Sequence, residues 1–580
     1  MSARPRTGLL GVLTVVLALV LAGCGAIPNN SSPQPIRAFQ RENPPNAVPA
    51  PQADMDSEAL VRAFVKATAN PRGNYRSARK FLTRSASEQW DSSGDMVVVD
   101  EVNVFIDERS ATTVRLRLVG DNVGTLRPDG QLLPATGRVA ATFDLRRVND
   151  QWRIDGRLPN GTLIDKNQFE SLYRSAVLYF PNSDRTALVP DPRWLYAGTD
   201  TDPGTLIRRL ISGPSTDLRA AAGTAFPRNA GLRGKVGAVA DGGVQVPLTG
   251  VGGLSDTDQQ LMVAQIVYTL EGLEIGGPYQ IDNDGVPLRS DKAEGWQPTD
   301  VAALDPNGAV AADVGLHVIR DGALLRVGDT ATAPVTGELG TGDDLRSASI
   351  SPDGKRIAGV LVRRPGAASS ELVVAPYGGA PDTLVSAASI TRPSFGRTAD
   401  TVWSVVDGRL QRWQREEDGV DHVAAIDISA VTNLVRGPIT ELQVAPDGVR
   451  VAMVVDGQLV FAVVSTNAEG RIMLTGPRIA AYNVGNRVTS IDWASPTTLM
   501  LARDSPESPV LQLSINGTQA VGLLSGNLSP PVRSVVADLS TVYVGDSRGV
   551  LSLGSTNGEP DQYWTEVETA MTPGSIPVLP

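Results

Sequence analysis

The sequence has few of the side chains on which catalytic and metal sites depend. It contains one cysteine and two histidines, His317 and His422, which are far apart in the chain. It has no paired-histidine zinc motif, Gly-x-Ser-x-Gly elbow, phosphate-binding loop or dinucleotide fingerprint. We interpret both histidines as surface or turn residues, and we predict a non-enzyme with no catalytic residue, metal site or cofactor. Paired carboxylates for glycoside cleavage stay open as an alternative, because a sequence does not show how its 63 acidic residues are spaced in the fold.

Lysine and aromatic residues are also scarce. Only six of the 52 basic residues are lysine, the formal net charge is −11, and no basic cluster is present. A nucleic-acid partner would need a Lys/Arg face opposite its phosphates, so we predict no nucleic-acid partner. Aromatic residues make up 5%, while 58 glycines and 41 prolines favour a turn-rich and strand-rich chain over a helical bundle. A chain of 580 residues is too long for one core and should form several domains.

The single cysteine follows a segment with the features of an export signal. Two arginines precede an uncharged apolar run over residues 9–21, which is shorter than the ~20 residues of a membrane-spanning helix. Leu21-Ala22-Gly23-Cys24 resembles the bacterial lipobox. The resemblance implies a lipoprotein signal peptide over residues 1–23, cleavage after Gly23, and S-diacylglycerol (palmitate-type) and N-acyl chains on Cys24. These chains would anchor the protein at the extracytoplasmic side of the cell membrane. A buried structural cysteine in an uncleaved anchor is the alternative.

A tether and a first domain are expected after the cysteine. Residues 24–55 are rich in proline and have almost no periodic apolar pattern, so we predict an extended tether. Residues 56–160 are predicted to hold two helices and then a curved antiparallel sheet, which resembles the cystatin/NTF2-type cone fold. The expected helices start at Asp56 or Ser57 and at residue 75, ending before 71 and near 90, and the expected strands are 96–107, 112–119 and 139–148, continuing into 151–154.

Residues 165–287 contain two well-marked helices between strands. One helix has Asp202 as its cap and ends at Gly213, and Ser255 begins a second helix that is apolar enough to be largely buried. Strands are expected over 178–180, over 188–193, where prolines break the strand, and over 244–248. This order of elements resembles the GerMN domain, which implies binding of a protein or a wall component.

From residue 299 the pattern changes to short strands and turns that repeat. Ser351-Pro352-Asp353-Gly354 recurs as Ala445-Pro446-Asp447-Gly448, and degenerate copies follow at intervals of roughly 45 residues. Each copy joins two strands through a tight turn. Four strands in each interval make a propeller blade, so residues 299–570 should form an all-β propeller of about six blades. The repeat resembles TolB-like and WD-type propellers.

Acidic motifs in these segments are better explained by turns than by ligands. Asp282-Asn283-Asp284-Gly285 begins like a calcium loop, but Val286 and Pro287 occupy positions that need oxygen ligands. We therefore predict a hairpin turn. Asp353 and Asp447 are likewise predicted to bond their own backbone.

The order of lipobox, tether, cone-like domain, GerMN domain and propeller resembles the LpqB family of actinobacterial lipoproteins. The resemblance implies a non-catalytic accessory of the MtrA-MtrB two-component system. Such a protein contacts the extracytoplasmic part of the sensor histidine kinase MtrB and modulates cell-wall homeostasis and cell division. We expect the GerMN or propeller surfaces to make this contact.

Two alternatives from other classes stay open. A protein that binds or processes cell-wall glycans could stack sugars on Trp403, Trp413 and Trp493, although burial between blades is the favoured interpretation. A carrier of a lipid or small molecule could line the first domain with the aromatic residues Phe64, Phe81, Trp90 and Phe105, although the same residues would be needed for its core.

Overall fold

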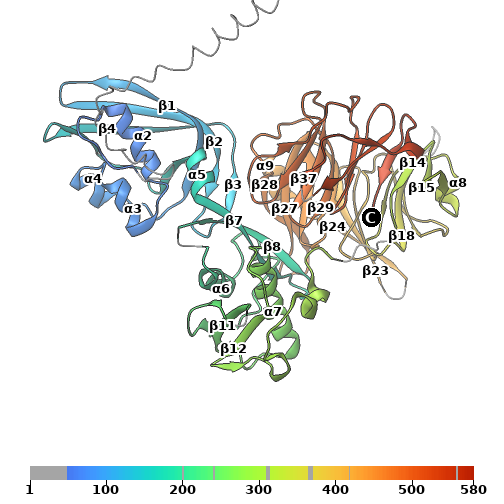
Figure 1. The fold of residues 1–580 in the computed structure, drawn as a ribbon. Helices are drawn as coiled ribbons and strands as arrows, with labels where there is room; N and C mark the ends of the chain where they lie inside the picture. The colour runs from blue at the N-terminus through green and yellow to red at the C-terminus, as the bar shows by residue number, and fades with distance from the viewer. Residues whose placement is uncertain are drawn as a thin grey trace, which may run out of the picture. The chain divides into compact units, whose positions relative to one another are not determined.

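The computed structural model describes residues 49–198, 201–239, 242–308, 314–362, 370–416, 419–556 and 559–580. The signal peptide, Cys24 and the tether up to residue 48 lie outside these residues. Val48–Pro580 form one compact unit, which contains the helical and sheet elements coloured from blue to red in Figure 1. The predicted fold class, α+β domains followed by an all-β propeller, is confirmed.

The first domain packs three helices on a mainly antiparallel sheet, with strand order β5-β4-β2-β1-β6 and β3 paired to β2 (Figure 1). The Asp56 side chain caps the first helix by accepting a hydrogen bond from the Ala59 amide at 2.8 Å. Val114, Leu116 and Leu118 alternate into the core, as the sequence predicts. The elements are α2 (Ser57–Ala67), α3 (Arg72–Arg79), α4 (Arg84–Gln89), β1 (Met96–Arg109), β2 (Thr113–Leu126), β3 (Leu132–Pro134), β4 (Arg138–Val148), β5 (Gln151–Asp155) and β6 (Thr162–Asp165).

The single helix predicted over residues 75–90 is wrong, because α3 and α4 are separate helices. Between them the chain pairs with β5: the Ile154 amide donates to the Phe81 carbonyl at 2.9 Å, and the Thr83 amide donates to the Ile154 carbonyl at 2.8 Å. The Thr83 hydroxyl then caps α4 at the Ala86 amide. A tertiary pairing thus overrides the helical pattern at Phe81 and Thr83.

The second domain begins with a two-stranded ribbon and places two capped helices against a second sheet. The Asp202 side chain caps α6 and the Ser255 hydroxyl caps α7, both as predicted. Leu261, Ile266 and Leu270 of α7 are fully buried. The elements are α5 (Lys166–Leu172), β7 (Tyr173–Pro181), β8 (Leu188–Tyr196), α6 (Pro203–Ser212), β9 (Gly231–Leu232), β10 (Gly237–Ala238), β11 (Val244–Thr249), α7 (Asp256–Glu271), β12 (Tyr279–Asn283), β13 (Val286–Pro287) and the 3-10 helices η1 (Ser290–Lys292) and η2 (Pro298–Leu304).

The prolines predicted to break a strand at residues 188–193 do not break it. Strand β8 continues through Pro190 and Pro192, which lie opposite Tyr179 and Val177 of β7. Positions two apart in a strand direct their amides to the same edge. Because β7 and β8 form a ribbon of only two strands, both prolines can turn the edge without an N–H away from the partner strand.

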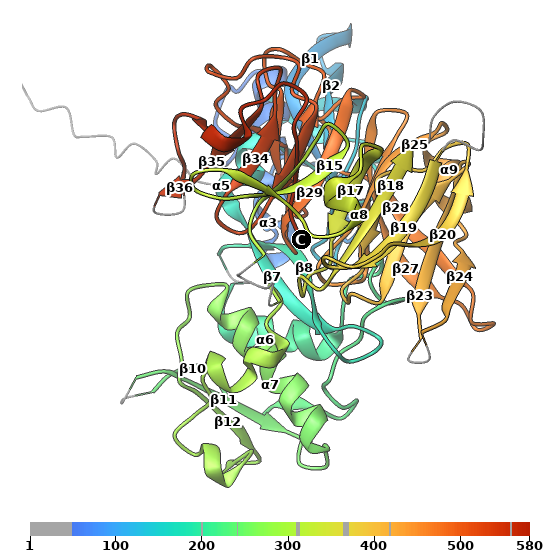
Figure 2. The ribbon, with the colours of Figure 1, turned by 90° about the vertical axis from the view of Figure 1, so that its right-hand side faces the viewer.

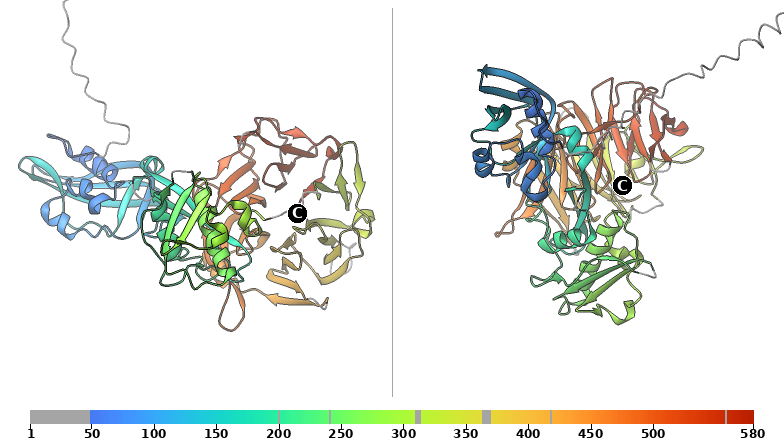
Figure 3. Two further views of the ribbon diagram at one scale, coloured as in Figure 1. Left: turned by 60° about the horizontal axis from the view of Figure 1, so that its bottom comes forward. Right: turned by 60° about the vertical axis from the view of Figure 1, so that its left-hand side comes forward.

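The propeller consists of six four-stranded antiparallel sheets. Figure 2 shows one of them, β17 to β20, side by side in chain order, and the left view of Figure 3 shows the sheets as a ring. The innermost strands are β17, β21, β25, β29, β33 and β39, and each contacts the next. Strand β39 pairs with β14 of the first sheet and contacts both β33 and β17, so it closes the ring.

The elements of this part of the chain are β14 (His317–Arg320), β15 (Ala323–Val327), β16 (Thr332–Pro334), α8 (Glu338–Thr341), β17 (Leu345–Ile350), β18 (Arg356–Val362), β19 (Ser370–Pro376), β20 (Asp382–Ala387), β21 (Ser394–Phe395), β22 (Thr401–Val406), β23 (Arg409–Arg415), β24 (Asp421–Ala425), α9 (Ser429–Leu434), β25 (Ile439–Val444), β26 (Arg450–Val455), β27 (Gln458–Thr466), β28 (Ile472–Ile479), β29 (Val488–Ser495), β30 (Thr498–Arg503), β31 (Val510–Ser514), β32 (Val521–Gly522), β33 (Ser534–Ala537), β34 (Val542–Gly545), β35 (Val550–Leu553), β36 (Ser555–Thr556), β37 (Glu559–Pro560), β38 (Thr565–Glu566), η3 (Glu568–Ala570) and β39 (Ile576–Val578).

The two Pro-Asp-Gly turns form as predicted, directly after innermost strands. The Asp353 carboxylate accepts from the Lys355 amide at 3.1 Å, and the Asp447 carboxylate accepts from the Val449 amide at 2.8 Å. The glycine of each turn has positive φ, 70° at Gly354 and 74° at Gly448. The repeated motif therefore marks the same end of each of these two blades.

The second of these turns also joins the propeller to the second domain. The guanidinium of Arg450 donates to the carbonyl of Pro190 in β8. Val449 belongs to the same buried cluster as Leu206 of α6 and the apolar face of α7. Nearby, the Trp194 indole donates to the Asn516 carbonyl at 2.8 Å. No sequence pattern predicts these contacts, because each pairs residues that are distant in the chain.

Candidate functional site

The two histidines lie in different environments, and neither forms part of a site with the other. His422 is exposed on β24, as predicted for a surface residue. The prediction is wrong for His317, which is fully buried on β14, where the sheet covers it. Its Nδ1 lies 3.2 Å from the Gly315 carbonyl oxygen and its Nε2 lies 2.6 Å from the Tyr377 hydroxyl.

These partners specify the protonation state of His317. A carbonyl only accepts, so Nδ1 carries the hydrogen, and Nε2 accepts from the Tyr377 hydroxyl. Burial lowers the pKa of His317 to about 4. The imidazole is thus neutral near pH 7 and links the first sheet of the propeller to the second, which is a structural role.

The acidic motif in the second domain is a hairpin turn, as predicted. Asp284 and Gly285 have positive φ of 54° and 86°, and they connect β12 to β13. The Asp284 carboxylate accepts a hydrogen bond from the Thr249 hydroxyl at 2.6 Å, and the Asn283 side-chain oxygen accepts from the Val251 amide at 3.0 Å. These side chains fasten the hairpin to the end of β11.

The aromatic residues that could have stacked a sugar are buried. Trp403, Trp413 and Trp493 are 3%, 4% and 7% exposed, which confirms that they pack between propeller strands. Phe461 stacks on Trp493 with ring centroids 5.7 Å apart. These three tryptophans therefore offer no exposed stacking face.

Three of the four aromatic residues proposed to line the first domain fill its core. Phe64 lies 5.7 Å from Trp90 and 6.5 Å from Phe81, measured between ring centroids. The prediction is wrong for Phe105, which is 47% exposed on the outer part of β1. The guanidinium of Arg117 lies over its ring at 5.5 Å.

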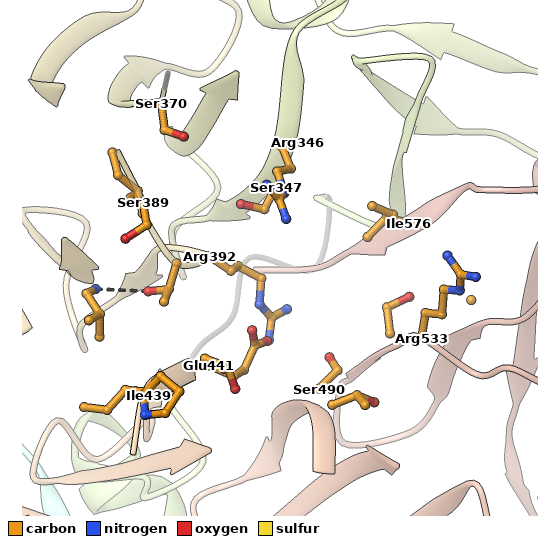
Figure 4. Close-up of a pocket in the computed structure, with 18 of the residues that line it drawn as sticks. Arg346, Ser347, Ser370, Ser389, Arg392, Ile439, Glu441, Ser490, Arg533 and Ile576 are labelled. Atoms are coloured by element: carbon orange, nitrogen blue, oxygen red, sulfur yellow. Dashed lines mark hydrogen bonds and ion pairs between the residues drawn. The ribbon is translucent and has the colours of Figure 1, made fainter. Parts of the chain in front are cut away.

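A cavity on the axis of the propeller is a candidate binding site. It has a volume of about 1090 Å³, and each of the six sheets contributes to its lining. Residues near the first position of the innermost strands surround it, including Arg346, Ile439, Ser490 and Ile576, which Figure 4 labels. Ser534 at the start of β33 also belongs to the lining. The cavity therefore lies at the end of the ring where the innermost strands begin.

An ion pair lies on one side of this cavity. Arg392 contacts the carboxylate of Glu441 at 2.8 Å and donates to the Ile491 carbonyl at 2.5 Å. Burial raises the pKa of Glu441, although Arg392 opposes the shift. Beside the pair, burial raises the pKa of Asp492 to about 6, and the Ala537 amide donates to its carboxylate at 2.9 Å. The close-up in Figure 4 shows Glu441 directed at Arg392.

Two other arginines at the cavity have no acidic partner among the described residues. Arg346 is the second residue of β17 and Arg533 directly precedes β33, and both are exposed. Among the residues that the structure describes, neither forms an ion pair, whereas Asp546 at the cavity pairs with Arg548 at 2.9 Å. The cavity thus carries uncompensated positive charge.

Sequence analysis missed this site, although the repeat contains a signal for part of it. Ser347 and Glu441 occupy equivalent positions, six residues before the aspartates of the Pro-Asp-Gly turns. In a propeller the residues that start the innermost strands converge on the axis. Aligning the repeats would have located these positions, but the charge balance depends on pairings that only the fold reveals.

Comparisons with known proteins cover nearly the whole chain. Residues 50–170 match the family model of the lipoprotein LpqB N-terminal domain, residues 177–289 match a model described as sporulation and spore germination, and residues 322–580 match the lipoprotein LpqB beta-propeller domain. Lipoprotein LpqB of Mycolicibacterium smegmatis is 37% identical over 99% of both chains, and that of Mycobacterium tuberculosis is 36% identical over 98% of this chain and 99% of its own.

Solved structures give a more distant likeness. A functionally unknown protein from Desulfotomaculum acetoxidans is 14% identical, with a TM-score of 0.33 over 47% of this chain and 88% of its own. Within the described ranges, no helix is both long and apolar enough to cross a membrane. With more than a third of its residues identical over almost its full length to named relatives, the chain belongs to the LpqB family of lipoproteins.

Proposed function

We propose that this protein is a non-catalytic lipoprotein, anchored at the extracytoplasmic side of the cell membrane through acylated Cys24. In this role it binds the extracytoplasmic part of the sensor histidine kinase MtrB and modulates the MtrA-MtrB system in cell-wall homeostasis and cell division. The observation that carries the proposal is the similarity to LpqB lipoproteins over the full length, including the lipobox at Leu21-Ala22-Gly23-Cys24.

The contacts between domains support a role as a rigid binder. Arg450 and Trp194 bond across the boundary between the propeller and the second domain, and Arg127 of the first domain pairs with Asp217 of the second at 2.9 Å. Domains held in this way lose little conformational freedom when a partner binds.

A lipid anchor with a long tether would favour encounter with a membrane partner. The part of the predicted tether that precedes the compact unit, residues 24–47, would span roughly 25–30 Å as a coil. Confinement to one membrane raises the effective concentration of the two proteins, so a weak contact suffices for regulation.

The positions of the histidines support a non-catalytic role. His317 is neutral, buried and bonded on both ring nitrogens, so it is not available as a general acid or base. His422 lies on an outer strand without a nearby nucleophile pattern in the sequence.

Calorimetry tests the proposal directly. Residues 26–580 keep the whole compact unit and would be titrated at moderate salt with the isolated extracytoplasmic domain of an MtrB-type kinase. We expect saturable binding with a defined stoichiometry. The proposal would be contradicted if residues 26–580, shown by circular dichroism to be folded, do not bind in solution and the acylated full-length protein does not bind the kinase when vesicles carry both. Serum albumin replaces the kinase domain as the control for non-specific heat.

A further inference from the structure

The propeller cavity combines unpaired positive charge with hydroxyl groups. Serine is the commonest residue in its lining, and threonine is also frequent. Arg346 and Arg533 come from different sheets, and among the described residues neither has an acidic partner. The two acidic lining residues are already paired, Glu441 with Arg392 and Asp546 with Arg548.

We infer that this cavity is a binding site for a small anionic ligand that carries hydroxyl groups together with a carboxylate or phosphate group. Arg346 and Arg533 hold the acidic group, because the guanidinium fork matches the geometry of carboxylate and phosphate oxygens. Ser347 and Ser490 lie around the same space in Figure 4, and Ser534 also belongs to its lining. Their hydroxyls can donate to or accept from ligand hydroxyls.

Two buried polar atoms in the wall of the cavity lack a hydrogen-bond partner in the described part of the chain. One is the Oγ of Ser575, a residue that is only 3% exposed. The other is the Nε of Arg392, whose Nη2 contacts Glu441 and Ile491. Other protein atoms cover both of them, so the cationic groups open to a ligand are the exposed Arg346 and Arg533.

The character of the lining argues for a small polar molecule. The cavity has a volume of about 1090 Å³, which is close to the upper end of the range for pockets that bind small ligands. None of the described lining residues is aromatic, so the site lacks the stacking surface that nucleobases would use.

The position of the cavity keeps this site separate from the domain junction. The Pro-Asp-Gly turn that contacts Pro190 follows the end of β25, whereas the cavity surrounds the start of the same strand. The two features lie at opposite ends of the ring. The proposed ligand site is therefore separate from the contact that joins the propeller to the second domain.

Calorimetric titration of the full chain in detergent tests the inference. The probes are glucose 6-phosphate, glucuronate and uncharged glucose, each at the same ionic strength. We expect saturable 1:1 binding of at least one anionic sugar and none of glucose. The comparison of phosphate with carboxylate identifies which acidic group the site prefers.

Substitutions then locate the bound anion. Replacing Arg346 and Arg533 by glutamine, singly, should weaken binding about tenfold or more, the usual effect of losing one charge-assisted hydrogen bond. R471Q is the matched control, since Arg471 is 79% exposed and lies outside the cavity.

The following results would overturn the inference. One is the absence of saturable binding of either anion up to roughly 10 mM, a limit that corresponds to negligible affinity. The other is binding that R346Q and R533Q leave unchanged, or that R471Q weakens equally, in protein with an unaltered thermal midpoint.

Discussion

The carboxylate of Asp447 and the guanidinium of Arg450 form a buried ion pair at 2.5 Å, with the side chains 0% and 7% exposed. The same guanidinium donates to the carbonyl of Pro190 in the second domain. A turn that the sequence presents as a local reversal is therefore also the joint between two domains. Its equivalent in the second blade, around Asp353, is solvated and makes no such contact among the described residues.

We expect R450A to destabilise the protein by about 3 kcal/mol, because removing one partner of a buried ion pair leaves the charge of Asp447 uncompensated. D353A is the matched control in the equivalent turn, where Lys355 is 81% exposed, and should cost about 1 kcal/mol or less. Thermal unfolding of residues 26–580 measures both. Equal shifts in the two variants would refute a special role for the Arg450 joint.

Cys24→Ser should abolish both acylation and cleavage after Gly23. The thiol is the atom that the lipobox chemistry modifies, and a hydroxyl does not replace it. Mass spectrometry of the N-terminal peptide from the membrane fraction checks the outcome. Gly25→Ser, outside the lipobox, should still give an acylated N-terminus at Cys24. A wild-type protein cut after Gly23 without acyl chains would contradict the anchor.

His317 should make the protein less stable as the pH falls. Its folded pKa of about 4 lies below the ordinary 6.5, so the unfolded state binds the proton first. The stability contribution is complete above pH 6.5 and is lost towards pH 4, by up to roughly 3 kcal/mol. We expect H317N to show a smaller loss of thermal midpoint than wild type between pH 7 and pH 4.5, while H422N behaves as wild type. Parallel curves for H317N and wild type would exclude this linkage.

Asp492 should make the protein less stable as the pH rises, which is the opposite of the effect of His317. Its pKa is raised to about 6, so its folded form holds a proton that the unfolded form has released, and its destabilising effect is largest at pH 7. D492N keeps an oxygen for the Ala537 amide and should stabilise the protein by about 1–2 kcal/mol at pH 7. The gain should shrink as the pH falls to 4. Urea unfolding at both pH values measures it, with E469Q as the control for an exposed acid.

Local signals were sufficient for many parts of this fold. The caps at Asp56, Asp202 and Ser255 and the turns at Asp353 and Asp447 depend on residues a few positions apart, and each forms as the sequence predicts. The wrong predictions depend on distant partners. Residues 81–83 leave their helical pattern because β5 supplies hydrogen bonds.

The candidate site also has a part that depends on residues close in the sequence and a part that depends on distant partners. The repeat shows which positions start the innermost strands, but Arg346 and Arg392 look alike in the sequence. Only the fold places Glu441 against Arg392 and leaves Arg346 without an acid among the described residues. Charge compensation is a property of pairs, so a single sequence does not show which arginine is available to a ligand.

Strand β39 sets the order in which this protein can complete its fold. It consists of Ile576–Val578, yet it pairs with β14, more than 250 residues earlier in the chain. During synthesis, the edge of β14 in the first sheet therefore stays unpaired until the strands of the five other sheets and β39 itself have been made. A product truncated before residue 576 would keep that edge open, where a protease or another strand could engage it. The ring of sheets can therefore close only in a chain that includes its C-terminal residues.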